Sequence, residues 1–169
     1  MKRDMCAWKN QVIADPVKKP MPILTFPVIQ LLGISVQELI SDSNTQAQAM
    51  KLLADRDDSL AAVSMMDLSL EAESFGAEIL VSEGEVPAIV GTLVNNQEEA
   101  DRLEVPAVGM GRTQIYLDAM ARSVELITDR PVLAGIIGPY SLAGRLLGTA
   151  QAMKACKKNP QLVHTVLEK

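Results

Sequence analysis

Several residue types that build common active sites are scarce in this sequence of 169 residues. It has one histidine, His164, and two cysteines, Cys6 and Cys156, which are far apart and lack the paired spacing of a zinc or redox motif. Neither a tetrahedral zinc site nor a Ser-His-Asp triad can be assembled from the chain alone. We expect reduced, packed cysteines, a solvated His164 and no metal site within the chain.

The chain is also short of aromatic side chains, positive charge and long apolar runs. Five aromatic residues and a net charge of −5 argue against binding to a phosphate backbone, so nucleic acid is not expected as a partner. No apolar run reaches the roughly 18 residues of a membrane-spanning helix, and residues 1–14 lack the pattern of a signal peptide. These absences predict a soluble, cytoplasmic protein with no membrane partner.

What the sequence does contain is an alternation of apolar runs with amphipathic segments. We expect buried strands over residues 23–29, 60–66 and 132–137, because each is a short apolar run bounded by turn signals. Such alternation is typical of βαβ units and a parallel sheet, so the predicted class is α/β. About three core strands occur by residue 169, whereas a barrel needs eight. The pattern predicts the amino-terminal half of a (β/α)8 TIM-type barrel.

Helix signals divide the chain into a leading segment and one incomplete barrel domain. Residues 1–21 are expected to form a helix and a linker, and residues 22–169 the first strands and helices of the barrel. Capping boxes that begin at Ser35 and Ser43 predict two helix starts. A small hairpin within residues 77–90 is expected to leave the barrel.

Four further helices are predicted in the second half of the sequence. One follows Asn96 as its cap, and one spans residues 112–127. The apolar face of the latter is expected to hold Tyr116, Met120, Val124 and Ile127. After Gly138-Pro139, a single helix should carry Leu142, Leu146, Ala150 and Met153. The last helix begins at Asn159-Pro160 and should bury Leu162, Val163, Val166 and Leu167.

Candidate site residues follow the predicted strands, because parallel α/β folds bind ligands beyond the carboxyl ends of their strands. The substrate-binding candidates are Thr25, Gln30, Gly138, Pro139, Tyr140 and Ser141. The catalytic candidate is Asp67, an acid placed directly after a buried strand, where it could bind a substrate cation or hold a reacting proton. It could equally cap the following helix, or do both. The turn over residues 138–141 could present amides and a hydroxyl to a ligand, or serve only as a turn.

At Asp67-Leu-Ser-Leu-Glu-Ala-Glu-Ser-Phe-Gly76, and again at Gly138-Pro-Tyr-Ser-Leu-Ala143, the sequence resembles the uroporphyrinogen decarboxylase superfamily. The resemblance extends to Lys169 and implies a (β/α)8 barrel. One branch of the superfamily is the decarboxylase of haem synthesis, and the other contains cobalamin-dependent methyltransferases. The resemblance implies that Asp67 matches the acid that faces the pyrrole nitrogens in decarboxylases, and that residues 138–142 match a wall of the same pocket.

The choice of branch depends on what this sequence lacks. Decarboxylases carry arginines just after the first strand for their substrate's carboxylates, whereas residues 25–33 here contain no cation. Desolvated carboxylates without partners would cost several kcal/mol. Arg145 also replaces a tyrosine typical of decarboxylases, and residues 69–76 are closer to the methyltransferase pattern. We therefore favour methyl transfer from a methylated corrinoid, or a corrinoid protein, to a small thiol such as coenzyme M.

Two alternatives stay open: a decarboxylase-like enzyme acting on a tetrapyrrole, and a non-catalytic half-barrel that binds a corrinoid protein or a complementary subunit. In the methyltransferase branch a zinc ion activates the thiol, and its His-x-Cys and later Cys ligands lie in the second half of the barrel. The resemblance thus implies that zinc and a corrinoid belong to the full-length enzyme, and that this chain alone holds no cofactor and is inactive. Open strand edges predict a homo-oligomer or a complementary half-barrel.

Overall fold

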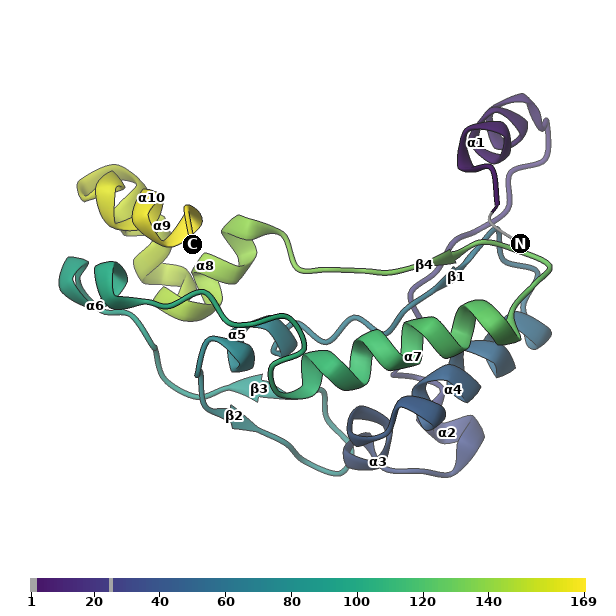
Figure 1. Cartoon of the computed structure of the whole chain (residues 1–169), viewed down its shortest axis with the longest axis horizontal. Helices are drawn as coiled ribbons and strands as arrows, with labels where there is room; N and C mark the ends of the chain where they lie inside the picture. The colour runs from purple at the N-terminus through teal and green to yellow at the C-terminus, as the bar shows by residue number, and fades with distance from the viewer. Residues whose placement is uncertain (1–2, 25) are drawn as a thin grey trace.

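Two short parallel strands lie toward the amino-terminal end of the computed structural model, which describes residues 3–24 and 26–169 (Figure 1). β1 (Ala62–Val63) pairs with β4 (Val132–Leu133), with Ala62 opposite Val132. Both strands fall inside predicted runs, and the chain between them passes through helices, as a parallel crossover requires. The α/β class is therefore confirmed.

The strands are shorter than predicted because side chains bind the backbone groups beyond the ladder. The Gly135 N–H donates to Ser64 Oγ at 2.8 Å, and the Gly135 carbonyl accepts from the Tyr116 hydroxyl at 2.6 Å. The Ile137 N–H donates to Glu71 Oε1 at 3.1 Å. Since buried backbone groups need partners of some kind, these contacts replace strand pairing.

The predicted strand over residues 23–29 is wrong. Residues 26–28 form a turn, and Ile29–Leu32 is the short helix α2, which Gly33 ends at φ +66°. Pro27 has no N–H to give to a ladder, and its fixed φ suits a helical turn. Val28 is fully buried by this turn, so the apolar run serves the core without forming a strand. Among the described residues the parallel sheet thus has two strands, not three.

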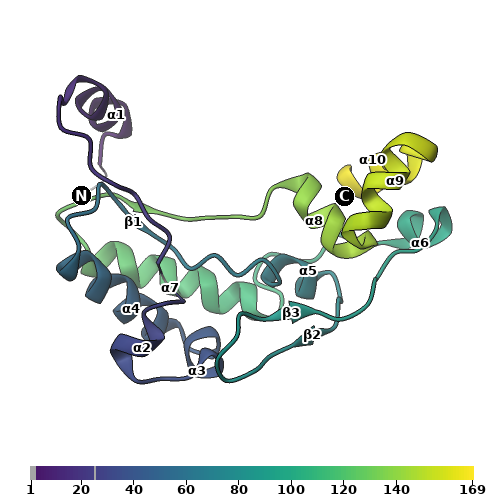
Figure 2. The same ribbon diagram turned by 180° about the vertical axis from the view of Figure 1, so that it is seen from behind.

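Helices α4 (Ser43–Arg56) and α7 (Arg112–Leu126) lie side by side against the parallel pair (Figures 1 and 2). The predicted apolar face of α7 is wrong in part, because Val124 is 59 % exposed while Ser123 is buried. The Ser123 hydroxyl donates to the Ala119 carbonyl and lies 3.3 Å from Met50 Sδ of α4. A hydroxyl satisfied within its own helix can pack in this close contact between helices.

Helix α3 (Val36–Ser41) begins with the predicted capping box, in which Ser35 and Glu38 bind each other's backbone amides. The cap of α4 is one residue earlier than predicted: Asp42 accepts the Thr45 N–H, and Ser43 is the first helical residue. A carboxylate is the stronger acceptor for the amides at a helix start. Helices α2, α3 and α4 share one apolar cluster.

The chain between the two parallel strands also holds the predicted excursion. Helix α5 (Leu70–Ser74) is followed by the antiparallel hairpin of β2 (Ile79–Leu80) and β3 (Ala88–Ile89), which is confirmed. Helix α6 (Gln97–Arg102) comes next, and Asn96 caps it by accepting the Glu99 N–H. These elements lead the chain away from the parallel strands and back to α7 (Figure 1).

Three helices close the chain: α8 (Pro139–Leu147), α9 (Thr149–Lys158) and α10 (Pro160–Leu167). The sequence predicted α8 and α9 as one helix, but Gly148 separates them at φ +81°, a conformation that ordinary side chains rarely adopt. In α10 the predicted stripe is buried except for Leu167, which is exposed. The three helices pack with α5 and α6 in a second apolar cluster.

Helix α1 (Met5–Ala14) stands away from the rest of the molecule and buries no residue (Figures 1 and 2). Arg3 donates to the Thr128 carbonyl at 2.9 Å, and Lys19 pairs with Asp58 just beyond the helix. Cys6 on this helix and Cys156 on α9 are free thiols. The prediction that they are packed is wrong, because both are exposed. Among the helices of the described residues, none combines the length and apolar character needed to cross a bilayer.

Candidate functional site at the ends of the parallel strands

Asp67 lies just past β1, and its side chain is 0 % exposed. One carboxylate oxygen, Oδ1, accepts both the N–H and the hydroxyl of Ser69, at 2.9 and 2.6 Å. The other oxygen, Oδ2, accepts a hydrogen bond from Nη1 of Arg112 at 2.5 Å. Asp67 therefore makes the turn contact expected of a residue before a helix, and its negative charge is paired with a guanidinium.

Arg112 links this turn to two helices. It is the first residue of α7, its side chain is 13 % exposed, and its Nε donates to Glu73 of α5 at 2.6 Å. Its Nη2 also donates to the Ser69 hydroxyl at 3.1 Å. The fork of one guanidinium thus binds two acids and a hydroxyl. Sequence reasoning missed Arg112, because nothing in its neighbourhood indicates a partner 45 residues earlier.

A second set of polar contacts joins the two strand ends. The Ser64 hydroxyl lies 2.7 Å from the Tyr116 hydroxyl, and both bind Gly135. Burial raises the pKa of Tyr116 above its ordinary value of 10, although the hydrogen bond with Ser64 opposes the rise. Tyr116 therefore remains a protonated donor at neutral pH. Gly135 has little room for a side chain, since a Cβ there would lie 3.1 Å from Met66.

Glu71 completes this edge of the site. Its Oε1 accepts the Ile137 N–H, while its enclosed Oε2 has no partner among the described residues. Together with Asp67 and Glu73 it brings three acids to the strand ends, against the guanidinium of Arg112. This edge of the molecule is therefore acidic.

The other sequence-predicted site residues are only partly brought together. Gly138 and Pro139 start α8 directly after Ile137, and Tyr140 and Ser141 line a cavity of about 260 Å³ between α8 and α9. Gln30 is exposed on α2, at the other end of the molecule from α8 (Figures 1 and 2). Thr25 lies outside the described residues.

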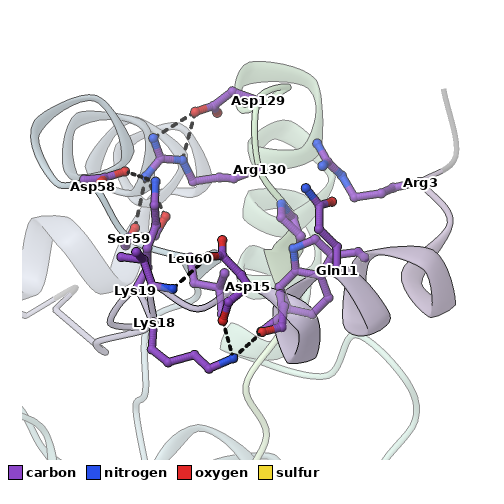
Figure 3. A pocket seen from close by; sticks show the side chains of 14 residues that line it. Arg3, Gln11, Asp15, Lys18, Lys19, Asp58, Ser59, Leu60, Asp129 and Arg130 are labelled. Atoms are coloured by element: carbon purple, nitrogen blue, oxygen red, sulfur yellow. Dashed lines mark hydrogen bonds and ion pairs between the residues drawn. The ribbon is translucent and has the colours of Figure 1, made fainter.

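A larger cavity, of about 350 Å³, lies elsewhere, between α1 and the amino ends of the strands. Figure 3 shows that its charged side chains are largely paired with one another: Arg130 with Asp129, and Lys19 with Asp58. Ligands of parallel α/β folds bind at the carboxyl ends of strands, so size does not make this cavity the functional site. We interpret this cavity as the space left where α1 and the segment after it meet the rest of the chain.

The described residues do not fit a zinc site. No three of their His, Cys, Asp or Glu side chains gather in a way that could hold a metal ion. Cys6, Cys156 and His164 are exposed on the separate helices α1, α9 and α10. A zinc ion with four-coordinate geometry would need ligands from outside this part of the chain.

A family model described as uroporphyrinogen decarboxylase (URO-D) matches residues 24–169. The chain belongs to the uroporphyrinogen decarboxylase family. The resemblance read from residues 67–76 and 138–143 is thereby confirmed. The match covers both the acidic strand ends and the α8–α9 cavity.

The chain is similar in sequence and in fold to methyltransferases of Methanosarcina. The chain is 30 % identical over 86 residues to the Methylcobamide:CoM methyltransferase MtbA of Methanosarcina acetivorans, a segment that covers 50 % of this chain and 25 % of that protein. It is 28 % identical over 90 residues to the MtbA of Methanosarcina mazei, with the same coverage of each. A solved methyltransferase from Methanosarcina mazei matches with a TM-score of 0.79 at 23 % identity, over 96 % of this chain and 49 % of that one. The chain thus shares the fold of about half of that structure.

Proposed function

We propose that the chain is the amino-terminal portion of a uroporphyrinogen decarboxylase-family methyltransferase, which moves a methyl group from a methylated corrinoid to a thiol such as coenzyme M. The two MtbA relatives and the fold shared with half of a methyltransferase support this proposal. On this view residues 1–169 are a single incomplete (β/α)8 barrel domain. Residues 1–21 lead into it, and the remaining strands belong to a longer enzyme or to a partner.

The observation that carries the choice of branch is the acidic edge at the strand ends. Asp67 matches an acid of decarboxylases as well, but Glu71 and Glu73 lie beside it, and Arg112 is already committed to Asp67 and Glu73. A substrate that carries many carboxylates needs several free cations to replace its lost hydration. An acidic edge would repel such a substrate, whereas a corrinoid presents neutral carboxamides along its rim. This favours the methyltransferase over the decarboxylase.

Asp67 remains our candidate catalytic residue in the complete enzyme. Its contacts with Ser69 and Arg112 hold the carboxylate in one orientation at the strand end. Zinc, which the methyltransferase branch requires, would need protein groups beyond those described, so the chain alone should be inactive. When zinc is bound it would lower the pKa of the acceptor thiol.

A non-catalytic half-barrel that binds a corrinoid protein or a complementary subunit is the second candidate. It is favoured by large apolar side chains that face solvent near the strand ends: Ile136 is 75 % exposed, and Leu68 and Met110 are exposed as well. Apolar surface next to open strand edges recruits partners. We propose a homo-oligomer or a complementary half-barrel as the working assembly.

Ligand choice tests the proposal of branch. The chain is titrated in parallel with methylcobalamin and with uroporphyrin, and binding is followed by absorbance. We expect saturable binding of the corrinoid and none of the polycarboxylate. Glu71→Gln combined with Glu73→Gln should allow weak binding of uroporphyrin at most, because it removes two negative charges but frees Arg112 only from Glu73. Glu98→Gln, which removes an exposed charge on α6, should allow none. Tight binding of uroporphyrin by the unaltered chain would favour the decarboxylase instead.

A further inference from the structure

The cavity between α8 and α9 has an open, small-residue floor. It is lined by Tyr140, Ser141, Gly144, Arg145, Thr149 and Ala152. Gly144 and Ala152 are buried, and a Cβ placed on Gly144 would approach nothing nearer than Thr149, at 3.9 Å. A hollow of about 260 Å³, which is large enough for a small organic anion, therefore lies beside the contact between the two helices.

Arg145 provides this hollow with a cation that has no acceptor. It is partly buried, yet none of the hydrogen bonds or ion pairs among the described residues involves its guanidinium. Arg112 and Arg130, which are also partly buried, both pair with carboxylates. A guanidinium has five N–H donors, and the Arg145 nitrogens are not among the enclosed side-chain atoms of the described residues, so a ligand can reach them. Arg145 is thus arranged for an acceptor that comes from outside the described chain.

The hydroxyl groups around Arg145 can also donate. Those of Ser141 and Thr149 have no partner among the described residues, and both line the cavity. The Tyr140 oxygen accepts a hydrogen bond from the Cys156 thiol at 3.4 Å, and this contact raises the pKa of Tyr140 above its ordinary value of 10. The phenol therefore keeps a proton to donate. None of the described residues that line the cavity is an acid.

The charge of the surrounding helices favours the same kind of ligand. The whole chain has a net charge of −5, but residues 139–169 carry one acid, Glu168, and five cations. These cations are Arg145, Lys154, Lys157, Lys158 and Lys169. A positive field around a cavity raises the local concentration of anions. In this respect the α8–α10 region differs from the acidic strand ends.

We infer that the α8–α9 cavity binds an oxyanion group, a sulfonate or a phosphate, with Arg145 as its principal contact and the hydroxyls of Ser141 and Thr149 as further donors. The identity of the molecule that carries this group rests on the proposed function, whereas the anion site itself does not. A sulfonate would be the anionic end of an acceptor such as coenzyme M, and a phosphodiester would be that of a corrinoid. A planar, forked guanidinium suits the oxygens of either group.

Calorimetric titration of the purified chain at low ionic strength tests the site, with ethanesulfonate and dimethyl phosphate as probes. We expect one saturable site, and we expect Arg145→Gln to weaken binding by about tenfold or more. Lys157→Gln is the matched control, because Lys157 is an exposed cation of α9 that does not line the cavity; it should change affinity by about twofold at most. Ser141→Ala, at an exposed position, should fold normally and weaken binding by about fivefold.

Preference for one probe identifies the source of the group, and either preference supports the site. The inference is overturned if neither probe binds, if Arg145→Gln binds as the unaltered chain does, or if Lys157→Gln weakens binding as much. Should Arg145→Gln fail to fold, as judged by circular dichroism, the Ser141→Ala result decides. The titrations need neither corrinoid nor methyl transfer. A decarboxylase-like ligand preference would therefore overturn the proposed function without affecting this result.

Discussion

Replacing Arg112 should destabilise the fold more than replacing any exposed arginine. Arg112→Met removes the partner of Asp67, whose side chain is 0 % exposed, and with it the donors to Glu73 and Ser69. Removing one partner of a buried pair costs about 3–5 kcal/mol. We expect the lower end, about 3 kcal/mol, because Asp67 keeps both hydrogen bonds from Ser69. Urea unfolding followed by circular dichroism should show the midpoint fall by about 1 M or more.

Two further variants make this test specific. Arg102→Met breaks an ion pair whose members, Arg102 and Glu98, are 75 % and 72 % exposed, so it should cost less than about 0.5 kcal/mol. Asp67→Asn combined with Arg112→Met should recover part of the loss, since the buried side chain of residue 67 then carries no charge. If Arg112→Met costs no more than Arg102→Met, or if the second substitution adds to the loss, the buried ion pair does not stabilise the strand ends.

Three other substitutions have expected effects on urea unfolding. Gly144→Ala should stabilise by about 0.5–1 kcal/mol, because Gly144 is in the interior of α8 and the added Cβ would meet only Thr149, at an ordinary 3.9 Å. Gly148→Ala should destabilise by about 1–3 kcal/mol, because φ is +81° and the Cβ would lie 3.0 Å from Thr92. Ser35→Ala should cost about 1 kcal/mol of α3 stability. The hydrogen bonds from Ser35 lower the pKa of Glu38 below its ordinary 4.5. Ionised Glu38 therefore contributes fully to the free energy of unfolding above pH 4.5, and this contribution is lost as the pH falls through the lower pKa of the folded state. Ser35→Ala should make the free energy of unfolding less dependent on pH in this acidic range.

The features that could be predicted from the sequence are those set by neighbouring residues. The capping box at Ser35, the cap at Asn96 and the hairpin near residue 84 depend on a few consecutive side chains, and all three occur. The misplaced strand at residues 23–29 shows the limit of this approach. An apolar run is compatible with a strand or a buried turn, and Pro27 favoured the turn.

The contacts that join distant segments could not be predicted in the same way. Asp67 was located correctly after a strand, but its partner Arg112 belongs to a helix that no local pattern connects to it. The lengths of β1 and β4 likewise depend on Tyr116 and Glu71, which bind backbone groups far along the chain. At α8 the sequence indicated Tyr140 and Ser141 but not the unpaired guanidinium of Arg145 beside them.

Methyl transfer by an assembled enzyme tests the central claim most directly. The chain would be combined with the carboxy-terminal half of the Methanosarcina mazei methyltransferase, and assembly would be verified by light scattering. Loss of methylcobalamin absorbance in the presence of coenzyme M and zinc would then be followed. The account predicts transfer by the assembled pair and none by this chain alone. Asp67→Asn should lower the transfer rate by more, expressed as a free energy, than it lowers the free energy of unfolding. An assembled pair that transfers no methyl group, or that releases carbon dioxide from uroporphyrinogen, would contradict it.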